Sequence, residues 1–150
     1  MTMSRVLDEG YGGGAWYGAD MKTAVTGVSG AEVFKRPAKG RHNIAEVALH
    51  HAYWAGQIES KLSGKAAGPF PLSGEDWFEV NNEKTLSWKA ITEALDAAQA
   101  RLAKTVKSLA GGKGSSPLSE REQEDLVIGI TGHAAYHAGQ IQLIKKLIGA

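Results

Sequence analysis

The sequence predicts an all-α protein, a four-helix bundle with a long crossover between its second and third helices. Apolar residues recur at three- and four-residue intervals over three long stretches, which is the helical period. No stretch shows the alternation of apolar and polar residues that is typical of a half-buried strand. A connection over residues 66–82 contains Pro69, Pro71 and Gly74 and separates two of the helical stretches. The chain has 150 residues, enough for one buried core, so we expect a single domain over residues 1–150.

Short helices are expected in the first forty residues, interrupted by glycine. Residues 4–9 can open a helix, which Gly10 and Gly12 to Gly14 then break. A second helix is expected over residues 16–25 with Gly27 as its stop, and a third short piece over residues 29–35. These pieces are too short to be stable without tertiary packing.

The first long helix follows Asn43. Its side chain suits an N-cap, and Glu46 three residues later suits the reciprocal arm of a capping box. Gly64 is expected to end the helix. The apolar stripe of this helix consists of Ile44, Val47, Ala48, His51, Ala55, Ile58 and Leu62.

Two further long helices complete the expected bundle. One begins near Thr85 or Ser87 and carries an apolar stripe from Trp88 to Leu109. The other begins after Ser119, which forms a capping box with Glu122. The apolar stripe of this last helix consists of Leu126, Ile130, His133, His137, Ile141, Ile144 and Ile148.

Composition excludes several classes of function. Seventeen basic residues against sixteen acidic ones give a net charge of +1, so we expect no nucleic-acid partner. The absence of cysteine excludes disulfides, cysteine nucleophiles and thiolate metal ligands. No apolar run reaches the roughly eighteen residues of a membrane span, and the N-terminus has no apolar signal segment. We therefore expect a cytoplasmic, bacterial protein without a membrane partner.

The most informative motif is the pair His133 and His137. Four residues apart on a helix, two imidazoles lie on one face and can bind the same divalent ion. Ala134 stands where the metalloprotease motif HExxH has its glutamate, which disfavours peptide hydrolysis of that type. Three protein ligands with an exchangeable position are typical of a catalytic metal site, so a third ligand is needed.

The third ligand is expected from the first long helix, which carries His50 and His51. Helical phase favours His51, which lies on the apolar stripe, whereas His50 lies about 100° away. From the residues alone, both candidates stay open. Imidazole binds Zn, Ni, Cu and Fe alike, and we expect Zn or Ni.

Four segments resemble those of one family. They are HNIAEVALHHAYW at residues 42–54, GITGHAAYHAGQI at residues 129–141, GGAWYG at residues 13–18 and DWF at residues 76–78. Together they resemble the DinB-like superfamily of metal-binding four-helix bundles, which includes the YfiT-like proteins. The resemblance covers nearly the whole chain.

The resemblance implies a ligand set of His50, His133 and His137. In the family the ligand of this helix is followed four residues later by Trp, which matches His50 and Trp54. His51 remains the alternative to His50 as the third ligand. Some members are metal-dependent transferases that activate a low-molecular-weight thiol, and others are described as metal-dependent hydrolases. The resemblance therefore implies a divalent metal cofactor and a small-molecule substrate, such as a thiol.

Four more residues are candidates for the surroundings of the metal. Glu46 lies one turn before His50 and is placed either to accept its second ring N–H or to complete the capping box. Gln140 is expected to bond a metal-bound water or to pair across helices. Trp16 and Tyr17 are candidates for the wall of the pocket mouth. No residue is identified as a catalytic base or nucleophile.

Two hypotheses for the function follow. The first is a metal-dependent enzyme, a thiol-dependent transferase or a hydrolase. The alternative is a helical module that binds metal or a small ligand without turnover, or that dimerises. Small residues on the last helix and the exposed aromatic residues lead us to expect a homodimer.

Overall fold

The computed structural model describes residues 3–150, and this part of the chain forms helices and no strands. Three of the helices are long and three are short. Their bounds are α1 Met3–Tyr11, α2 Met21–Val25, α3 Gly30–Val33, α4 Ile44–Ser63, α5 Trp88–Ala110 and α6 Glu120–Ile148. The prediction of an all-α protein is therefore confirmed for the described residues.

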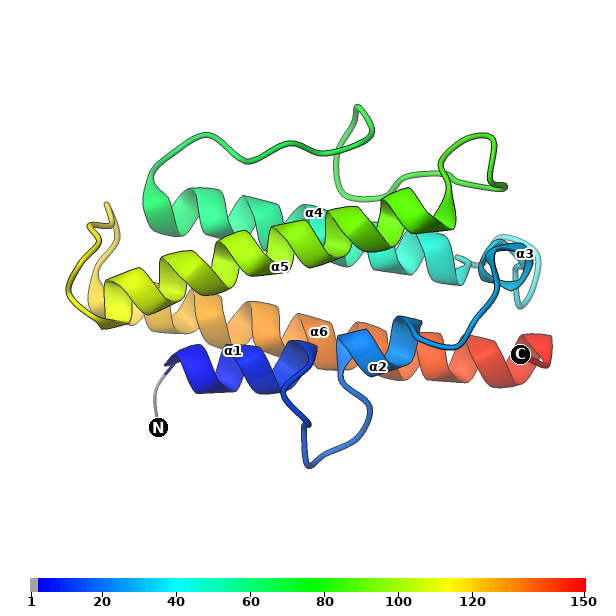
Figure 1. Cartoon of the computed structure of the whole chain (residues 1–150), viewed down its shortest axis with the longest axis horizontal. Coiled ribbons are helices and arrows are strands. Elements are labelled where there is room, and N and C mark those ends of the chain that lie inside the picture. The colour runs from blue at the N-terminus through cyan, green and yellow to red at the C-terminus, as the bar shows by residue number, and fades with distance from the viewer. Residues whose placement is uncertain (1–2) are drawn as a thin grey trace.

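The long helices lie side by side (Figure 1). Helix α4 packs against α5 and α6, and α6 also packs against the short helices α1 and α2. The connection between α4 and α5 returns along the length of the molecule, so these two helices run in the same direction and α6 runs opposite to both (Figure 1). The long connection expected at residues 66–82 is present, and it contains no helix between Gly64 and Ser87.

Helix α4 begins and ends where its sequence predicts. The Asn43 side chain accepts a hydrogen bond from the backbone N–H of Glu46 at 2.9 Å. At the other end, Gly64 has a φ of 68°, a left-handed conformation that favours glycine, and its N–H bonds the Ser60 carbonyl. The capping box, however, is incomplete, because the Glu46 carboxylate is engaged elsewhere.

Helices α5 and α6 also have the expected caps. Ser87 caps α5, and Ser119 forms a complete capping box with Glu122 at the start of α6. The prediction for residues 16–25 is wrong over its first half. Gly18 takes a φ of 151°, and Asp20 caps a helix that starts only at Met21.

The core consists of two apolar clusters that meet in the middle of α4 and α6. One includes Ala52 and Ala134, and the other includes Ala55 and Ile130. His133 lies between Ile130 and Ala134 on α6, and His51 directly precedes Ala52 on α4, so histidines interrupt the apolar core near the place where the two clusters meet.

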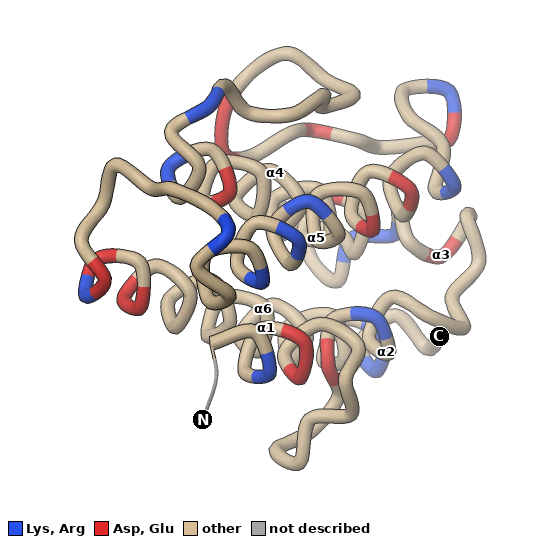
Figure 2. Tube along the Cα trace, turned by 60° about the vertical axis from the view of Figure 1, so that its left-hand side comes forward, with Lys and Arg blue, Asp and Glu red and all other residues tan. Residues whose placement is uncertain are grey.

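Charged residues of both signs are distributed over the elements (Figure 2). None of the helices formed by the described residues has the length and hydropathy of a membrane-crossing segment.

Candidate metal centre

Helices α4 and α6 bring three histidines together. One ring nitrogen from each of His50, His133 and His137 lies within 4.8 Å of the others. His133 Nε2 is 3.1 Å from His50 Nε2 and 3.1 Å from His137 Nε2. These contacts join His133 and His137 on α6 to His50 on α4, which runs antiparallel to α6.

Two of these rings are held by their outer nitrogens. His50 Nδ1 donates to the backbone carbonyl of Asp76 at 2.9 Å, and His137 Nδ1 donates to Oε1 of Gln140 at 2.8 Å. A neutral imidazole carries one proton, so both Nε2 atoms are then unprotonated and present lone pairs to the centre. Such outer partners fix the tautomer and orientation of a metal-ligating histidine.

Without a cation, the neutral imidazoles cannot place an N–H donor between both pairs of facing nitrogens. His133 Nε2 faces the lone pairs of both His50 and His137, and a single N–H on it can donate to only one of them. At least one pair of nitrogens at 3.1 Å therefore has no hydrogen between its lone pairs. A positive ion among the three nitrogens removes this repulsion.

The spacing of the nitrogens fits a metal ion. Ligand bonds of about 2.0–2.1 Å at angles between octahedral and tetrahedral place two nitrogens roughly 2.9–3.4 Å apart. Both measured Nε2–Nε2 distances, 3.1 Å, fall in this range. The donor set is three imidazoles without a carboxylate or thiolate, which suits a divalent transition metal.

The electrostatics keep these imidazoles neutral. Burial, together with the neighbouring His137 and His50, lowers the pKa of His133 to about 4. Burial also lowers the pKa of His50 and of His137 below the usual value. Neutral imidazole is the form that binds metal, so the site has its ligands in the required state at neutral pH.

His51 lies on the other side of His133. Its Nδ1 is 2.9 Å from His133 Nδ1, and its side chain is only 1% exposed. Its Nε2 is buried and has no hydrogen-bond partner among the described residues. His51 therefore contacts the nitrogen of His133 that faces away from the cluster, and it does not join the three nitrogens itself.

Sequence reasoning assigned no role at this site to Asp76. In addition to the backbone carbonyl that accepts from His50, Asp76 contributes its carboxylate to the site. Asp76 Oδ1 lies 3.1 Å from His50 Nδ1 and accepts a hydrogen bond of 2.7 Å from Trp54 Nε1. Asp76 has a φ of 64°, which is uncommon outside glycine. The sequence feature that marked Asp76 was its place in the DWF segment, and this segment lies far from the histidines in sequence.

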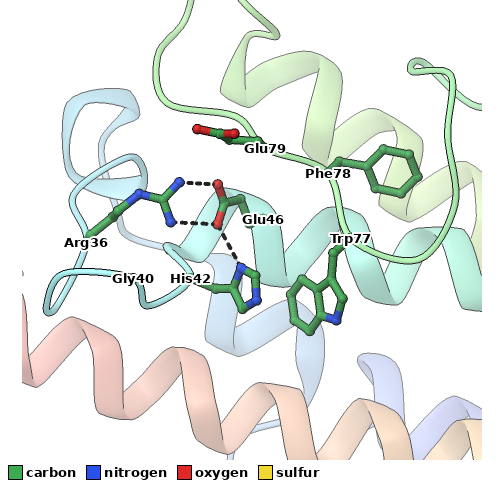
Figure 3. A pocket seen from close by; sticks show the side chains of 7 residues that line it. All are labelled: Arg36, Gly40, His42, Glu46, Trp77, Phe78 and Glu79. Carbon is green, nitrogen blue, oxygen red and sulfur yellow. Dashed lines mark hydrogen bonds and ion pairs between the residues drawn. The ribbon is translucent and has the colours of Figure 1, made fainter.

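Trp77 lies against two of the three histidines and also lines a pocket. The indole stacks between His42 and His50, with ring centroids 3.8 Å from each. The pocket has a volume of about 430 Å³, and its lining includes His42, Trp77 and Glu46 (Figure 3). Trp77 thus separates the pocket from the His50 ligand.

Glu46 is not the partner of His50. Its buried carboxylate accepts hydrogen bonds from the Arg36 guanidinium and from His42 Nδ1 at 2.9 Å (Figure 3). It also accepts one from the backbone N–H of Val80 at 3.2 Å. Both ring nitrogens of His50 are engaged by other groups, so the expectation that Glu46 accepts the His50 N–H is wrong. Gln140 lies at the site, where its Oε1 accepts a hydrogen bond from His137 Nδ1.

The structure does not bring Trp16 and Tyr17 to the histidines. They lie in the loop between α1 and α2, on the side of the molecule away from the 64–87 connection (Figure 1). Trp16 is 91% exposed, and its ring lies edge-to-face with the ring of Tyr17. Among the described residues, the aromatic side chains that contact the three histidines are Trp77 and Tyr136.

A comparison with protein families supports the resemblance. The sequence model of the DinB superfamily matches residues 16–141, which contain all the histidines of the cluster. Neither the search of curated proteins nor the search of solved structures finds a match to this chain.

Proposed function

Because the chain belongs to the DinB superfamily, we propose that it is a metal-dependent enzyme whose divalent ion binds His50, His133 and His137. The observation that carries the proposal is the convergence of three histidine ring nitrogens from two helices at ligand spacing. Zinc and nickel are the ions that we favour among the divalent metals that bind neutral imidazole.

The proposed fold is a four-helix bundle forming a single domain. In this interpretation α1 and α2 together take the place of the fourth helix, since both pack along α6 and α1 also contacts α5. The 64–87 connection is then the crossover, and it supplies Asp76 and Trp77 to the site.

The chain's own residues hold and shape the site. Asp76 and Gln140 orient two of the ligands, and Trp77 forms a wall between the ligand His50 and the neighbouring pocket. When bound, the ion would supply Lewis acidity and lower the pKa of a coordinating thiol or water. Three protein ligands leave a coordination position for such a group.

We favour a thiol over water as the nucleophile. Hydrolysis at a metal site commonly needs a general base, but the carboxylates nearest the site are committed: Glu46 to Arg36 and His42, and Asp76 to Trp54 and His50. A thiol loses its proton far more readily than water and needs no dedicated base. Three neutral protein ligands also leave the positive charge of the ion available to an anionic thiolate.

The proposed reaction is the transfer of a low-molecular-weight thiol to a small electrophile. The sulfur forms a bond to the electrophilic carbon, the leaving group departs with its electron pair, and the thiol proton passes to solvent.

Metal content tests the binding site. We expect one equivalent of metal in the purified protein and loss of tight zinc binding in the single variants His50→Ala, His133→Ala and His137→Ala, as measured by elemental analysis and chelator competition. His42→Ala is the matched control, because His42 lies outside the three nitrogens, and it should retain the ion. A wild-type protein that binds no divalent metal would contradict the proposal.

Turnover separates the enzyme from the alternative, a metal-binding module without catalysis. The zinc- and nickel-loaded proteins are incubated with cysteine or coenzyme A and 1-chloro-2,4-dinitrobenzene, and thioether formation is followed by absorbance. We expect a rate above that of His133→Ala with at least one thiol. Hydrolysis of 4-nitrophenyl acetate without any thiol effect would favour the hydrolase, and no rate in either assay would favour the module.

A further inference from the structure

His133 lies between two consecutive residues of α4. His50 approaches its Nε2 and His51 approaches its Nδ1, at 3.1 Å and 2.9 Å. The His51 and His133 rings are close to parallel, with centroids 5.1 Å apart and an interplanar angle of 24°. Adjacent residues on one helix thus contact opposite nitrogens of the same ring.

The proton between His51 and His133 has one consistent position. If His133 Nε2 is a metal ligand, its proton is on Nδ1, which then donates to an unprotonated His51 Nδ1. The proton of His51 is consequently on Nε2, the atom that is buried without a partner. The third ligand therefore has an outer acceptor, as the other two have in Asp76 and Gln140.

The unsatisfied nitrogen argues that His51 is more than a core residue. A buried N–H without a partner is costly, and an apolar side chain of similar volume would avoid this cost. The imidazole at this position compensates only through its other nitrogen, which contacts His133.

We propose that His51 is a positioning residue of the metal site, which holds His133 in the Nδ1–H tautomer with Nε2 turned to the ion. This rests on the proposed function. His51 adds no charge to the site, in contrast to the carboxylate that often has this role.

The test compares His51→Phe with His51→Asn. Phe removes the acceptor, whereas the Asn Oδ1 lies near the place of the imidazole Nδ1 and restores it. We expect zinc affinity, measured by chelator competition, to fall about 10- to 100-fold in the Phe variant and to return to within a few-fold of wild type in the Asn variant. Ile141→Val, which trims a buried residue one turn beyond His137, is the control and should leave zinc affinity unchanged.

A second readout does not depend on a variant folding. In the zinc-loaded wild type, nitrogen-15 NMR should show His133 protonated at Nδ1 and the proton of His51 on Nε2. Zinc affinity in His51→Phe equal to wild type, equal loss in both variants, or His133 protonated at Nε2 would each overturn the inference while leaving zinc binding intact. Absence of zinc binding in wild type would instead overturn the proposed function and this inference with it.

An independent observation concerns the outer face of α6. A stripe of six residues on this face is exposed, and four of them are large and apolar: Tyr136 is 70% exposed, Ile128 63%, Leu147 61% and Leu143 56%. The other two are Gly132 and Gly139, where an added Cβ would meet nothing within 4 Å. We refer to Ile128, Gly132, Tyr136, Gly139, Leu143 and Leu147 as the α6 stripe.

The α6 stripe is self-complementary in the antiparallel direction. Asp125, Ile128 and Gly132 follow one another at intervals of three and four residues, and Lys146, Leu143 and Gly139 repeat these intervals in reverse. Two copies of α6 packed antiparallel would therefore place Gly132 against Gly139, Ile128 against Leu143 and Asp125 against Lys146. Glycines at the centre permit close approach of the two backbones, and both charged residues are exposed.

We infer that the α6 stripe binds a second copy of this chain. The twofold symmetry of such a dimer forms each contact twice, including the Asp125–Lys146 ion pair. The charge complementarity at both ends of the stripe favours a second copy over another partner.

Sedimentation equilibrium of the full chain tests this interface. We expect a dimer for wild type, a monomer for Tyr136→Glu, weaker association for Asp125→Lys, and recovery when Lys146→Asp is added to it. Glu93→Lys makes the same charge change on α5 and should remain dimeric. A monomeric wild type, or a dimer that is unaffected by Tyr136→Glu, would overturn the inference.

Discussion

At the scale of single residues, neighbouring histidines on α4 have different tasks. Helical phase favoured His51 as the third ligand because this residue lies on the apolar stripe, and His51 is indeed buried, but the structure gives His50 the contact with His133 Nε2. Phase was misleading here because the cluster of three histidines does not face the centre of the apolar stripe. The resemblance supplied the assignment to His50.

We predict that Asp76 controls metal affinity through His50. Asp76→Ala removes the carboxylate that accepts a hydrogen bond from Trp54 Nε1. It also places alanine at a positive φ, a conformation that alanine rarely adopts. We expect zinc affinity to fall roughly tenfold or more, the effect typical of losing an outer partner of a ligand. Chelator competition measures this.

Asp76→Asn is the matched variant, because it keeps an oxygen for the indole and tolerates the left-handed conformation. It should retain most of the affinity. Equal zinc affinity in wild type and Asp76→Ala would show that the backbone carbonyl alone positions His50.

Asp76 also shows the limit of the sequence argument at this scale. Its contact with His50 spans 26 residues and depends on how a connection without helices folds. Periodicity describes faces of helices and contains no information on such a segment. The pair His133 and His137 was predictable because its spacing lies within one helix.

At the scale of elements, the N-terminus of α4 is anchored to the long connection that follows the helix. Asn43 is fully buried, and its amide nitrogen donates to the carbonyl of Val80 at 2.8 Å while its oxygen caps the helix. The cap was predictable from the sequence, since it is local. The bond to Val80 was not, because it joins α4 to the long connection.

We predict a difference between two substitutions of this residue. Asn43→Ala loses the cap and leaves the Val80 carbonyl without its donor, so the free energy of unfolding should fall by about 2–4 kcal/mol. Asn43→Ser keeps a capping oxygen and loses the amide donor to Val80 without burying a charge. It should be destabilised less.

Urea denaturation measures both values. Identical stability of the two variants would contradict separate contributions of the cap and the Val80 bond. The error at residues 16–25 is of a different kind, because a local cap starts the helix late: the Asp20 side chain accepts a hydrogen bond from the N–H of Thr23.

At the scale of the whole molecule, Glu46 joins the segment before α4, α4 itself and the long connection. It contacts Arg36, His42 and the Val80 backbone. Burial alone would raise the pKa of this carboxyl, but the hydrogen bonds from Arg36, His42 and Val80 outweigh it and lower the pKa below the usual value. The charged form is therefore favoured by folding.

The sign of the pH dependence follows from this shift. Because the pKa of Glu46 is lower in the folded state, its stabilisation is fully present above the unfolded pKa of about 4.3 and is lost as the pH falls through the folded value. We expect Glu46→Gln to be less stable than wild type by about 2 kcal/mol at pH 7, since Arg36 loses its charged partner.

The stability difference between wild type and Glu46→Gln should narrow below about pH 4. Urea denaturation of both proteins at several pH values measures it. A difference that stays constant down to the acid transition would show that the Glu46 charge does not stabilise the fold.

The measurement that tests the metal centre most directly is X-ray absorption at the zinc edge of the loaded protein. The three-histidine site predicts scattering from three imidazoles bound at about 2.0–2.1 Å, with at least one further light ligand from solvent. His137→Ala should reduce the number of imidazoles in any zinc that remains. A spectrum with one imidazole or none in the wild-type protein would contradict a site formed by His50, His133 and His137.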